Sequence, residues 1–295
     1  MSEKHRVGFH VKSMDELKRF VGLGINLVEL KPDKMARAGD QLYSFDGKRF
    51  TINEPVAIEI SDLCQEHDVQ VQIHLPYENK NDPSEERGLC YAVRDHHELL
   101  MDRFRTVAEL HDYKIGEVVV VHPPQLVAGG VEICGYYNGI ELGRTFLHYL
   151  DMEMREHGWE FKVGVENMIA PKGDSMNLGY SVSQMKHLLG NTKNIGINVD
   201  SGHRLLSDEM SVAELFGIAP IVSLHFHTNP GIFHEEGYDD DAHKFATAKT
   251  LEHFNSYIRS ARRFETPIVC EISSLSNVPD KQIQSYVGWL QFLLK

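Results

Sequence analysis

One stretch of this sequence combines residue types that could do metal chemistry. Ile195-Gly-Ile-Asn-Val-Asp200-Ser-Gly-His203 reads as a short β-branched strand that ends in an acid, followed by a glycine-containing turn and a histidine. Residues two apart on a strand point to one face, so Asp200 shares the face of Asn198. His203 on the turn can reach the same opening. A carboxylate and an imidazole placed together at a strand end predict a metal site.

The same pattern recurs at the ends of other apolar segments. The residues concerned, besides Asp200 and His203, are His74, His122, Glu166, His225, His227 and Glu271, with Asp241 and His243 in a later loop. Taken singly, each is better explained as a core, capping or surface residue, and Asp241 ends an acidic run that by itself predicts a solvated loop. Gathered together, however, several buried acids would be very costly without a cation. Imidazole and carboxylate ligands favour Zn, Mn, Fe or Co. His10 and Glu29, which also lie near strand ends, are left open between substrate contact and structure.

The elements that must position these residues alternate along the chain. Short strands are expected at 6–11, 26–30, 69–75, 117–122, 161–167, 195–200, 221–227 and 268–272. Helical segments are expected between them, and Ser13–Glu16 and Ser211–Glu214 have the capping-box spacing that opens a helix. Residues 41–52 predict a small inserted hairpin that turns at Asp46-Gly47. Eight strands alternating with eight helical segments predict one α/β domain over residues 1–295, a (β/α)8 TIM barrel with its active site at the C-terminal strand ends. An open doubly wound sheet is the alternative, but no Gly-x-Gly-x-x-Gly follows the first strand.

Composition narrows the class of protein. The 295 residues carry a formal net charge of -13, which argues against a general polyanion binder but leaves room for a local basic groove. The four cysteines are far apart, with no Cys-x-x-Cys, and are expected to be reduced thiols of a cytoplasmic protein. There is no apolar signal core and no run of membrane-spanning length. We expect a monomer that does not bind membranes.

Several short segments resemble the xylose-isomerase-like barrel superfamily, and most closely the endonuclease IV family. They are Gly8-Phe-His-Val11, His74-Leu-Pro-Tyr77, Val121-His122-Pro123, Glu166-Asn167, Asn177-Leu-Gly179-Tyr180, Asp200-Ser-Gly-His203, His225 and Glu271. The resemblance spans nearly the whole chain. It implies a zinc-dependent apurinic/apyrimidinic endonuclease with a cluster of three metal ions.

Carried over by position, the resemblance also implies a ligand set. One ion would be held by His74, His122 and Glu166; a second by the bridging Glu166 with Asp200, His225 and Glu271; and a third by His203, Asp241 and His243. The implied cofactor is Zn²⁺, two to three ions, with Mn²⁺, Fe²⁺, Co²⁺ or Mg²⁺ as alternatives. Glu166 and Glu271 are expected to be catalytic, and His10, Tyr77, Asn167 and His227 to contact substrate.

Three functions remain open at this point. The leading expectation is hydrolysis of the phosphodiester 5′ to an abasic nucleotide in DNA, with the metals activating a water molecule. The basic residues after the second strand, Lys31, Lys34, Arg37, Lys48 and Arg49, would then grip the DNA backbone or else form a solvated hairpin. The alternative is a single-metal isomerase or epimerase of a sugar or sugar phosphate, which needs only Glu166, Asp200, His225 and Glu271. His74 and His122 therefore discriminate between the two. A non-catalytic barrel that binds a metabolite or protein is the third function, and the intact ligand set disfavours it.

Overall fold

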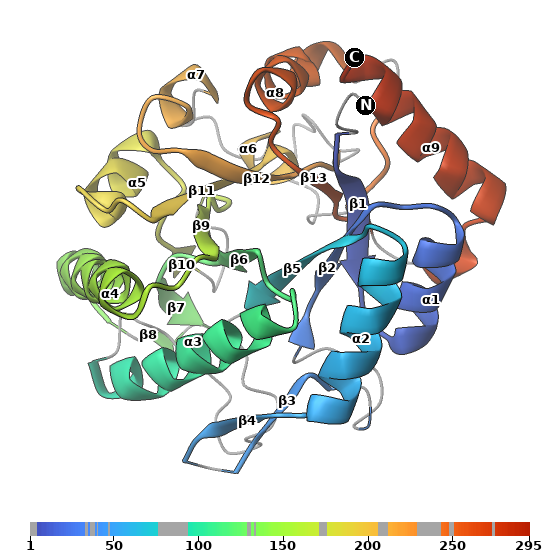
Figure 1. Cartoon of the computed structure of the whole chain (residues 1–295). Coiled ribbons are helices and arrows are strands. Elements are labelled where there is room, and N and C mark those ends of the chain that lie inside the picture. The colour runs from blue at the N-terminus through green and yellow to red at the C-terminus, as the bar shows by residue number, and fades with distance from the viewer. Residues whose placement is uncertain are drawn as a thin grey trace.

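Eight parallel strands close into a barrel in this computed structural model. Their order around the barrel is β1 (Val7–Val11), β13 (Ile268–Cys270), β12 (Ile221–His225), β11 (Ile195–Asp200), β9 (Lys162–Glu166), β6 (Val118–Val121), β5 (Gln70–Leu75) and β2 (Leu27–Leu30). The structure describes residues 5–32, 35, 39, 41–46, 48–75, 94–128, 131–132, 134–170, 176–205, 212–228, 243–247, 251–272 and 275–295. Figure 1 looks into this barrel, with the helices arranged around it. The predicted (β/α)8 fold is confirmed.

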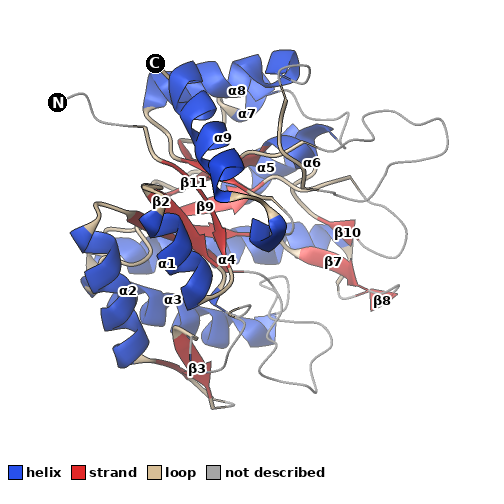
Figure 2. Ribbon diagram, turned by 90° about the vertical axis from the view of Figure 1, so that its right-hand side faces the viewer, coloured by secondary structure: helices blue, strands red, loops and turns tan. Residues whose placement is uncertain are grey.

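Helices connect the strands and cover the outside of the barrel (Figure 2). The longer ones are α1 (Met14–Gly22), α2 (Glu54–Glu66), α3 (His97–Asp112), α4 (Tyr136–His157), α5 (Val182–Leu189), α8 (Leu251–Phe264) and α9 (Asp280–Leu293). The short ones are α6 (Ser201–Leu205), α7 (Val212–Leu215) and the 3₁₀ turns η3 (Arg94–His96) and η4 (Leu275–Asn277). Helix α1 begins as predicted, because the Ser13 hydroxyl accepts a hydrogen bond from the Glu16 amide at 3.2 Å. None of the helices described is long and apolar enough to cross a membrane.

Two small antiparallel sheets decorate the barrel. The predicted hairpin is present as β3 (Tyr43–Phe45) and β4 (Phe50–Ile52). It is fastened to α3, because the Asp102 carboxylate accepts a hydrogen bond from the Phe50 amide at 2.7 Å and buried Arg103 donates to the Tyr43 hydroxyl. The second sheet, β10 (Met176–Asn177), β7 (Gln125–Ala128) and β8 (Val131–Glu132), was not predicted. Its strands have two to four residues, which is too short for an alternating pattern to be recognised.

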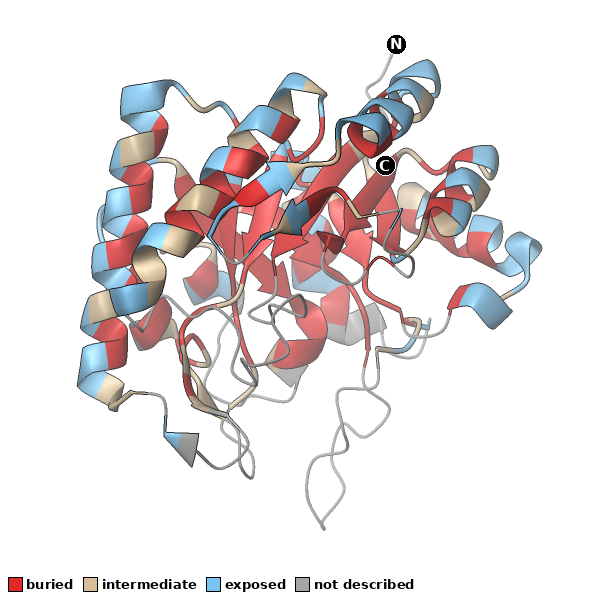
Figure 3. Cartoon of the chain, turned by 90° about the horizontal axis from the view of Figure 1, so that it is seen from below, coloured by how far each residue is buried: buried red, intermediate tan, exposed pale blue. Residues whose placement is uncertain are grey.

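The barrel interior changes from apolar to polar towards the C-terminal strand ends. Val118, Val120 and Val222 form a small apolar cluster near the other end. Above it lies a polar level in which the Ser223 hydroxyl donates to the Gln72 side chain at 3.0 Å, both fully buried. The main apolar core lies between the strands and the inner faces of the helices, as the buried residues in Figure 3 show. The apolar core that stabilises the barrel therefore lies apart from the polar residues at the C-terminal strand ends.

Candidate metal centre

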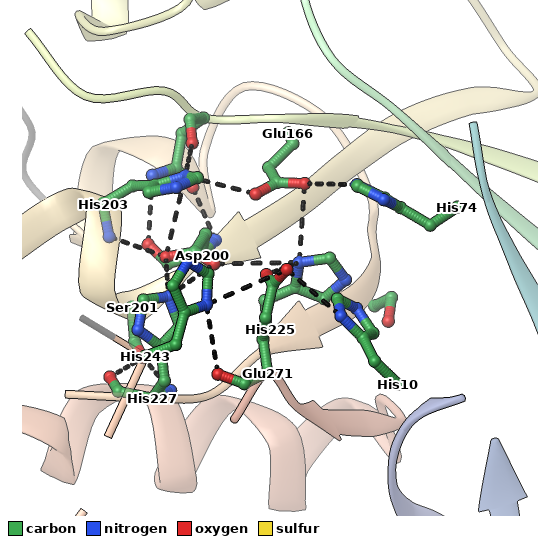
Figure 4. Close-up of polar contacts among 12 residues, drawn as sticks. His10, His74, Glu166, Asp200, Ser201, His203, His225, His227, His243 and Glu271 are labelled. Carbon is green, nitrogen blue, oxygen red and sulfur yellow. Dashed lines mark hydrogen bonds and ion pairs between the residues drawn. The ribbon is translucent and has the colours of Figure 1, made fainter. Parts of the chain in front are cut away.

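Histidines and acids from most of the barrel strands converge at the C-terminal end (Figure 4). The strands themselves contribute His10 (β1), Glu29 (β2), His74 (β5), Glu166 (β9), Asp200 (β11) and His225 (β12), and Lys31, His122, His203, His227, His243 and Glu271 lie beyond strand ends. Alternate residues of a barrel strand face inwards, so each strand delivers its polar residue to the same space. Within the described residues, five overlapping groups of three or four His, Asp and Glu side chains are close enough to hold a metal ion.

Glu166 is the hub of this cluster. Its Oε2 atom lies 3.2 Å from His74 Nε2 and 3.6 Å from His122 Nε2. The same oxygen lies 3.4 Å from His225 Nδ1, and Oε1 lies 3.2 Å from His203 Nδ1. Burial opposes ionisation, but the charge of His225 and hydrogen bonds from the surrounding histidines hold the pKa of Glu166 well below its ordinary value. The carboxylate is therefore ionised and central, as expected of a bridging ligand.

His225 presents a buried nitrogen to three carboxylates. Its Nδ1 atom lies 3.2 Å from Glu271 Oε2, 3.4 Å from Glu166 Oε2 and 3.7 Å from Asp200 Oδ2, yet among the described residues it has no partner with hydrogen-bond geometry. Burial lowers the pKa of His225, but the negative charges of Glu29 and Glu166 raise it well above its ordinary value. A proton on His225 thus supplies positive charge where a bound cation would supply it instead. The chemistry of this donor set, three carboxylates and an imidazole, fits a divalent metal ion.

Glu29 fixes the orientation of the His225 ring. Both oxygens of this fully buried carboxylate lie 3.1 Å from His225 Nε2, on the side of the ring away from the other acids. A proton on Nε2 that is donated to Glu29 leaves Nδ1 as the ligand atom, an arrangement common around protein metal sites. Burial opposes ionisation of Glu29, but the charges of His225 and His10 hold its pKa far below the ordinary value. Sequence reasoning left Glu29 open; its contacts assign it an orienting role.

His74 and His122 form a second ligand group with Glu166. Burial lowers the pKa of His74 to about 3 and that of His122 to about 4. The positive charge of Lys31 acts in the same direction on both. Both rings are therefore neutral near pH 7, and the neutral imidazole is the form that binds metals. The buried Nδ1 of His74 has no hydrogen-bond partner within the part of the chain that the structure describes. The group expected from the sequence is assembled.

The third expected group is described only in part. Asp241 and Tyr77 lie outside the described residues. His203 instead joins Asp200 and His227, and His243 joins His227 and Glu271. The Nε2 atom of His227 lies 3.0 Å from each Asp200 oxygen, and its ring stacks on that of His243 with centroids 4.3 Å apart. His227, which was expected to contact substrate, is fully buried among these side chains.

Asn167 and Gly202 position the Asp200–His203 turn. The Asn167 amide group accepts a hydrogen bond from Asp200 N at 2.7 Å and donates one to Asp200 O at 3.0 Å. Asn167 was expected to contact substrate. In the structure it is fully buried, and its contacts hold the backbone of Asp200. A Cβ atom on Gly202 would overlap the ring of His227. The glycine in this turn therefore lets His227 approach Asp200.

Lys31 is the residue whose role sequence reasoning assigned incorrectly. It was grouped with surface cations, yet it is 8% exposed, and its Nζ atom lies 2.7 Å from Glu271 Oε1. The physical reason is alternation, since Lys31 comes two residues after Glu29 and shares its inward direction. Among the other basic residues of that group, Lys48 and Arg49 are exposed on the hairpin, and Lys34 and Arg37 lie outside the described residues. His10 also lies inside the cluster, 2.5 Å from Glu29 Oε1 and 3.1 Å from Glu271 Oε1.

Comparison with known protein families identifies one family that matches most of the chain. A family model described as xylose isomerase-like TIM barrel matches residues 17–292. No curated protein sequence matches the chain.

Solved structures with the same architecture include several sugar epimerases. A D-tagatose 3-epimerase-like protein has a TM-score of 0.67 at 18% identity, with 98% of this chain and 100% of that chain covered. The 3-keto-D-glucoside 4-epimerase from E. coli has a TM-score of 0.61 at 14% identity, with 98% and 100% covered. The D-psicose 3-epimerase from Clostridium cellulolyticum H10 has a TM-score of 0.63 at 8% identity, with 98% and 99% covered. At these identities, the likeness establishes the fold.

Proposed function

We propose that this chain, which belongs to the family of xylose isomerase-like TIM barrels, is a divalent-metal-dependent isomerase or epimerase of a sugar or sugar phosphate. The observation that carries the proposal is the convergence of Glu166, Asp200 and Glu271 on the Nδ1 atom of His225. The resemblance to this superfamily implies the same four residues as the metal ligands of a sugar isomerase or epimerase. The sugar epimerases among the similar structures support this reading over phosphodiester cleavage.

The chain's own groups suit proton transfer at a carbon next to a carbonyl. A divalent ion bound by this set would polarise the carbonyl and an adjacent hydroxyl of the substrate. Glu166 reaches the centre from β9 and Glu271 from the end of β13, with β11 and β12 between them in the barrel. The pKa of each carboxyl is held well below its ordinary value against the effect of burial, by His225 at Glu166 and by His10 and Lys31 at Glu271.

Epimerisation follows from two carboxylates on different sides of one carbon. One carboxylate would take the proton from the carbon, while the other, having first taken up a proton from water, would give it to the opposite face. The configuration then inverts, and the first carboxyl returns its proton to water, so that no atoms are gained or lost. Isomerisation between ketose and aldose needs the same first step and returns the proton to the neighbouring carbon. We assign Glu166 and Glu271 as the two proton-transfer groups.

Phosphodiester hydrolysis is the second candidate, and one observation favours it. His74 and His122 lie beside Glu166 as a further ligand group, which a single-metal isomerase does not need. A second ion there would be the feature that distinguishes a nuclease centre from an isomerase centre.

Isotope exchange tests the proposal directly. Metal-replete protein is incubated in D₂O with a panel of ketoses and ketose phosphates, and deuterium at the carbon next to the carbonyl is followed by NMR. We expect incorporation with at least one substrate, and loss of roughly a hundredfold or more in rate in Glu166→Gln and Glu271→Gln. Glu59→Gln, at an exposed ion pair with Lys18, is the matched control and should exchange normally.

The same preparation is given a duplex with a tetrahydrofuran abasic analogue. Nicking that a chelator abolishes, without exchange in any sugar, would transfer the assignment to the second candidate. Exchange without nicking supports the isomerase.

A further inference from the structure

Lys31 brings a fixed positive charge into the metal centre. Its side chain is 10% exposed, and its ammonium lies 2.7 Å from Glu271 Oε1. A buried ammonium is costly unless it is paired and hydrogen-bonded, and here the partner is a carboxylate of the proposed metal group. The ammonium also interacts with the charges of Glu29 and Glu166. Lys31 is therefore part of the charge balance of the centre.

One consequence concerns the two oxygens of Glu271. Oε1 lies 2.7 Å from Lys31 Nζ and 3.1 Å from His10 Nδ1, so two groups from β1 and from the end of β2 engage it. Oε2 faces the other way and lies 3.2 Å from His225 Nδ1. The lysine therefore leaves Glu271 a single oxygen for an ion in the Glu166–Asp200–His225 group.

A second consequence concerns the group formed by His74, His122 and Glu166. Short contacts connect Lys31 to this group: Glu271, which it pairs with, lies 3.2 Å from His225 Nδ1, that nitrogen lies 3.4 Å from Glu166 Oε2, and the same oxygen lies 3.2 Å from His74 Nε2. A divalent ion held by His74 and His122 would therefore draw on the same connected, buried carboxylates as this ammonium, in a place where charges are poorly screened. Three cations would then share these carboxylates: the ion in the primary group, the ion at His74 and His122, and the lysine.

We propose that Lys31 is an internal cation that limits this centre to one tightly bound divalent ion. It acts as a positioning residue by holding Glu271 Oε1, and it opposes a second ion at His74 and His122. The inference rests on the proposed function only in taking Glu166, Asp200, His225 and Glu271 as the primary metal group. The proposal explains how the protein could work with one ion although His74, His122 and Glu166 form a second group of possible ligands.

Manganese binding to chelator-stripped protein tests this without any substrate. Calorimetry with Mn²⁺ gives the number and affinity of ions, and electron paramagnetic resonance distinguishes an isolated ion from a magnetically coupled pair. In the unchanged protein we expect one tight ion with an isolated spectrum and a second ion at least a hundredfold weaker. In Lys31→Met we expect the second ion to bind at least tenfold more tightly and to give a coupled spectrum.

Three further variants keep the result specific. Lys31→Arg retains the charge and should behave as the unchanged protein. Lys12→Met removes an exposed lysine that directly follows β1 at the same barrel end, and it should also leave the isotherm unchanged. Adding His74→Ala to Lys31→Met should abolish the second ion, which assigns it to the His74 group.

The proposal is overturned if the unchanged protein binds two ions of similar affinity, or if Lys31→Met reproduces its single-ion isotherm. The first measurement needs no variant, so it can overturn the proposal even if the Lys31→Met protein fails to fold. Failure of isotope exchange with intact single-ion binding would instead count against the proposed reaction and leave the role of Lys31 standing.

Discussion

At the scale of single residues, the centre depends on side chains that would not themselves bind an ion. Glu29 determines which nitrogen of His225 faces the acids, and Asn167 holds the backbone of Asp200. The sequence predicted that these acids and histidines gather at one end of the barrel, because residues at strand ends are recognisable by position. It did not predict the direction of Lys31, since a lysine in a basic segment is ordinarily solvated and only the closed barrel shows that it faces inwards.

Glu29→Gln should weaken metal binding while the fold survives. The amide can present an N–H group to His225 Nε2, which favours the tautomer with its proton on Nδ1, the nitrogen that must be free for the ion. Changes to such orienting carboxylates typically reduce metal affinity by about 10–100-fold, and we expect a loss in that range, measured by competition with a chelator. Glu16→Gln, on the surface at the start of α1, is the control. Unchanged affinity in Glu29→Gln would show that the ring is oriented by other contacts.

At the scale of elements, the strand ends and the turns after them carry the site. Eight strands were predictable because each is a β-branched run between helical segments, and the capping box of α1 was read correctly from Ser13 and Glu16. The sheet formed by β7, β8 and β10 was missed because its strands have only two to four residues, and because β10 pairs with β7 from a distant part of the sequence. The need for a glycine at position 202 was also invisible, because it arises from the approach of His227.

Gly202→Ala tests how closely the turn is packed. The added methyl group would overlap the His227 ring, so either this ring or the turn that carries His203 must move. We expect metal affinity to fall by roughly tenfold or more, with a cost to stability of about 1–3 kcal/mol, typical of overpacking. Gly22→Ala is the matched control, since a Cβ atom at the end of α1 meets nothing within 4 Å. Calorimetry and thermal unfolding of both variants give the two readouts. Normal metal binding by Gly202→Ala would mean that the turn yields at no cost to the centre.

At the scale of the whole molecule, the apolar core that stabilises the fold and the polar residues of the candidate metal centre occupy different parts of the structure. The apolar core lies between the barrel and its helices, while the acids and histidines occupy one end. Four buried carboxylates, Glu29, Glu166, Asp200 and Glu271, share that end with a single buried lysine and several histidines among the residues described. Without a bound ion, their mutual repulsion is relieved in part by the neighbouring ammonium of Lys31 and by His225, whose pKa the charges of Glu29 and Glu166 raise well above its ordinary value. The barrel should therefore fold without metal but gain stability from it.

Metal removal should lower the thermal unfolding temperature without abolishing the cooperative transition. An ion that binds only the folded chain adds about 2.7 kcal/mol of stability at a concentration one hundred times its dissociation constant. For a chain of this size that corresponds to a shift of roughly 4–5 °C. We expect this rise when Mn²⁺ is added to stripped protein, followed by circular dichroism. Glu166→Gln, which removes the hub carboxylate, should lose most of the rise, whereas Glu59→Gln should keep it. A stripped protein that fails to fold would show that the ion is structural, and equal transitions with and without Mn²⁺ would show that the buried acids hold no ion at all.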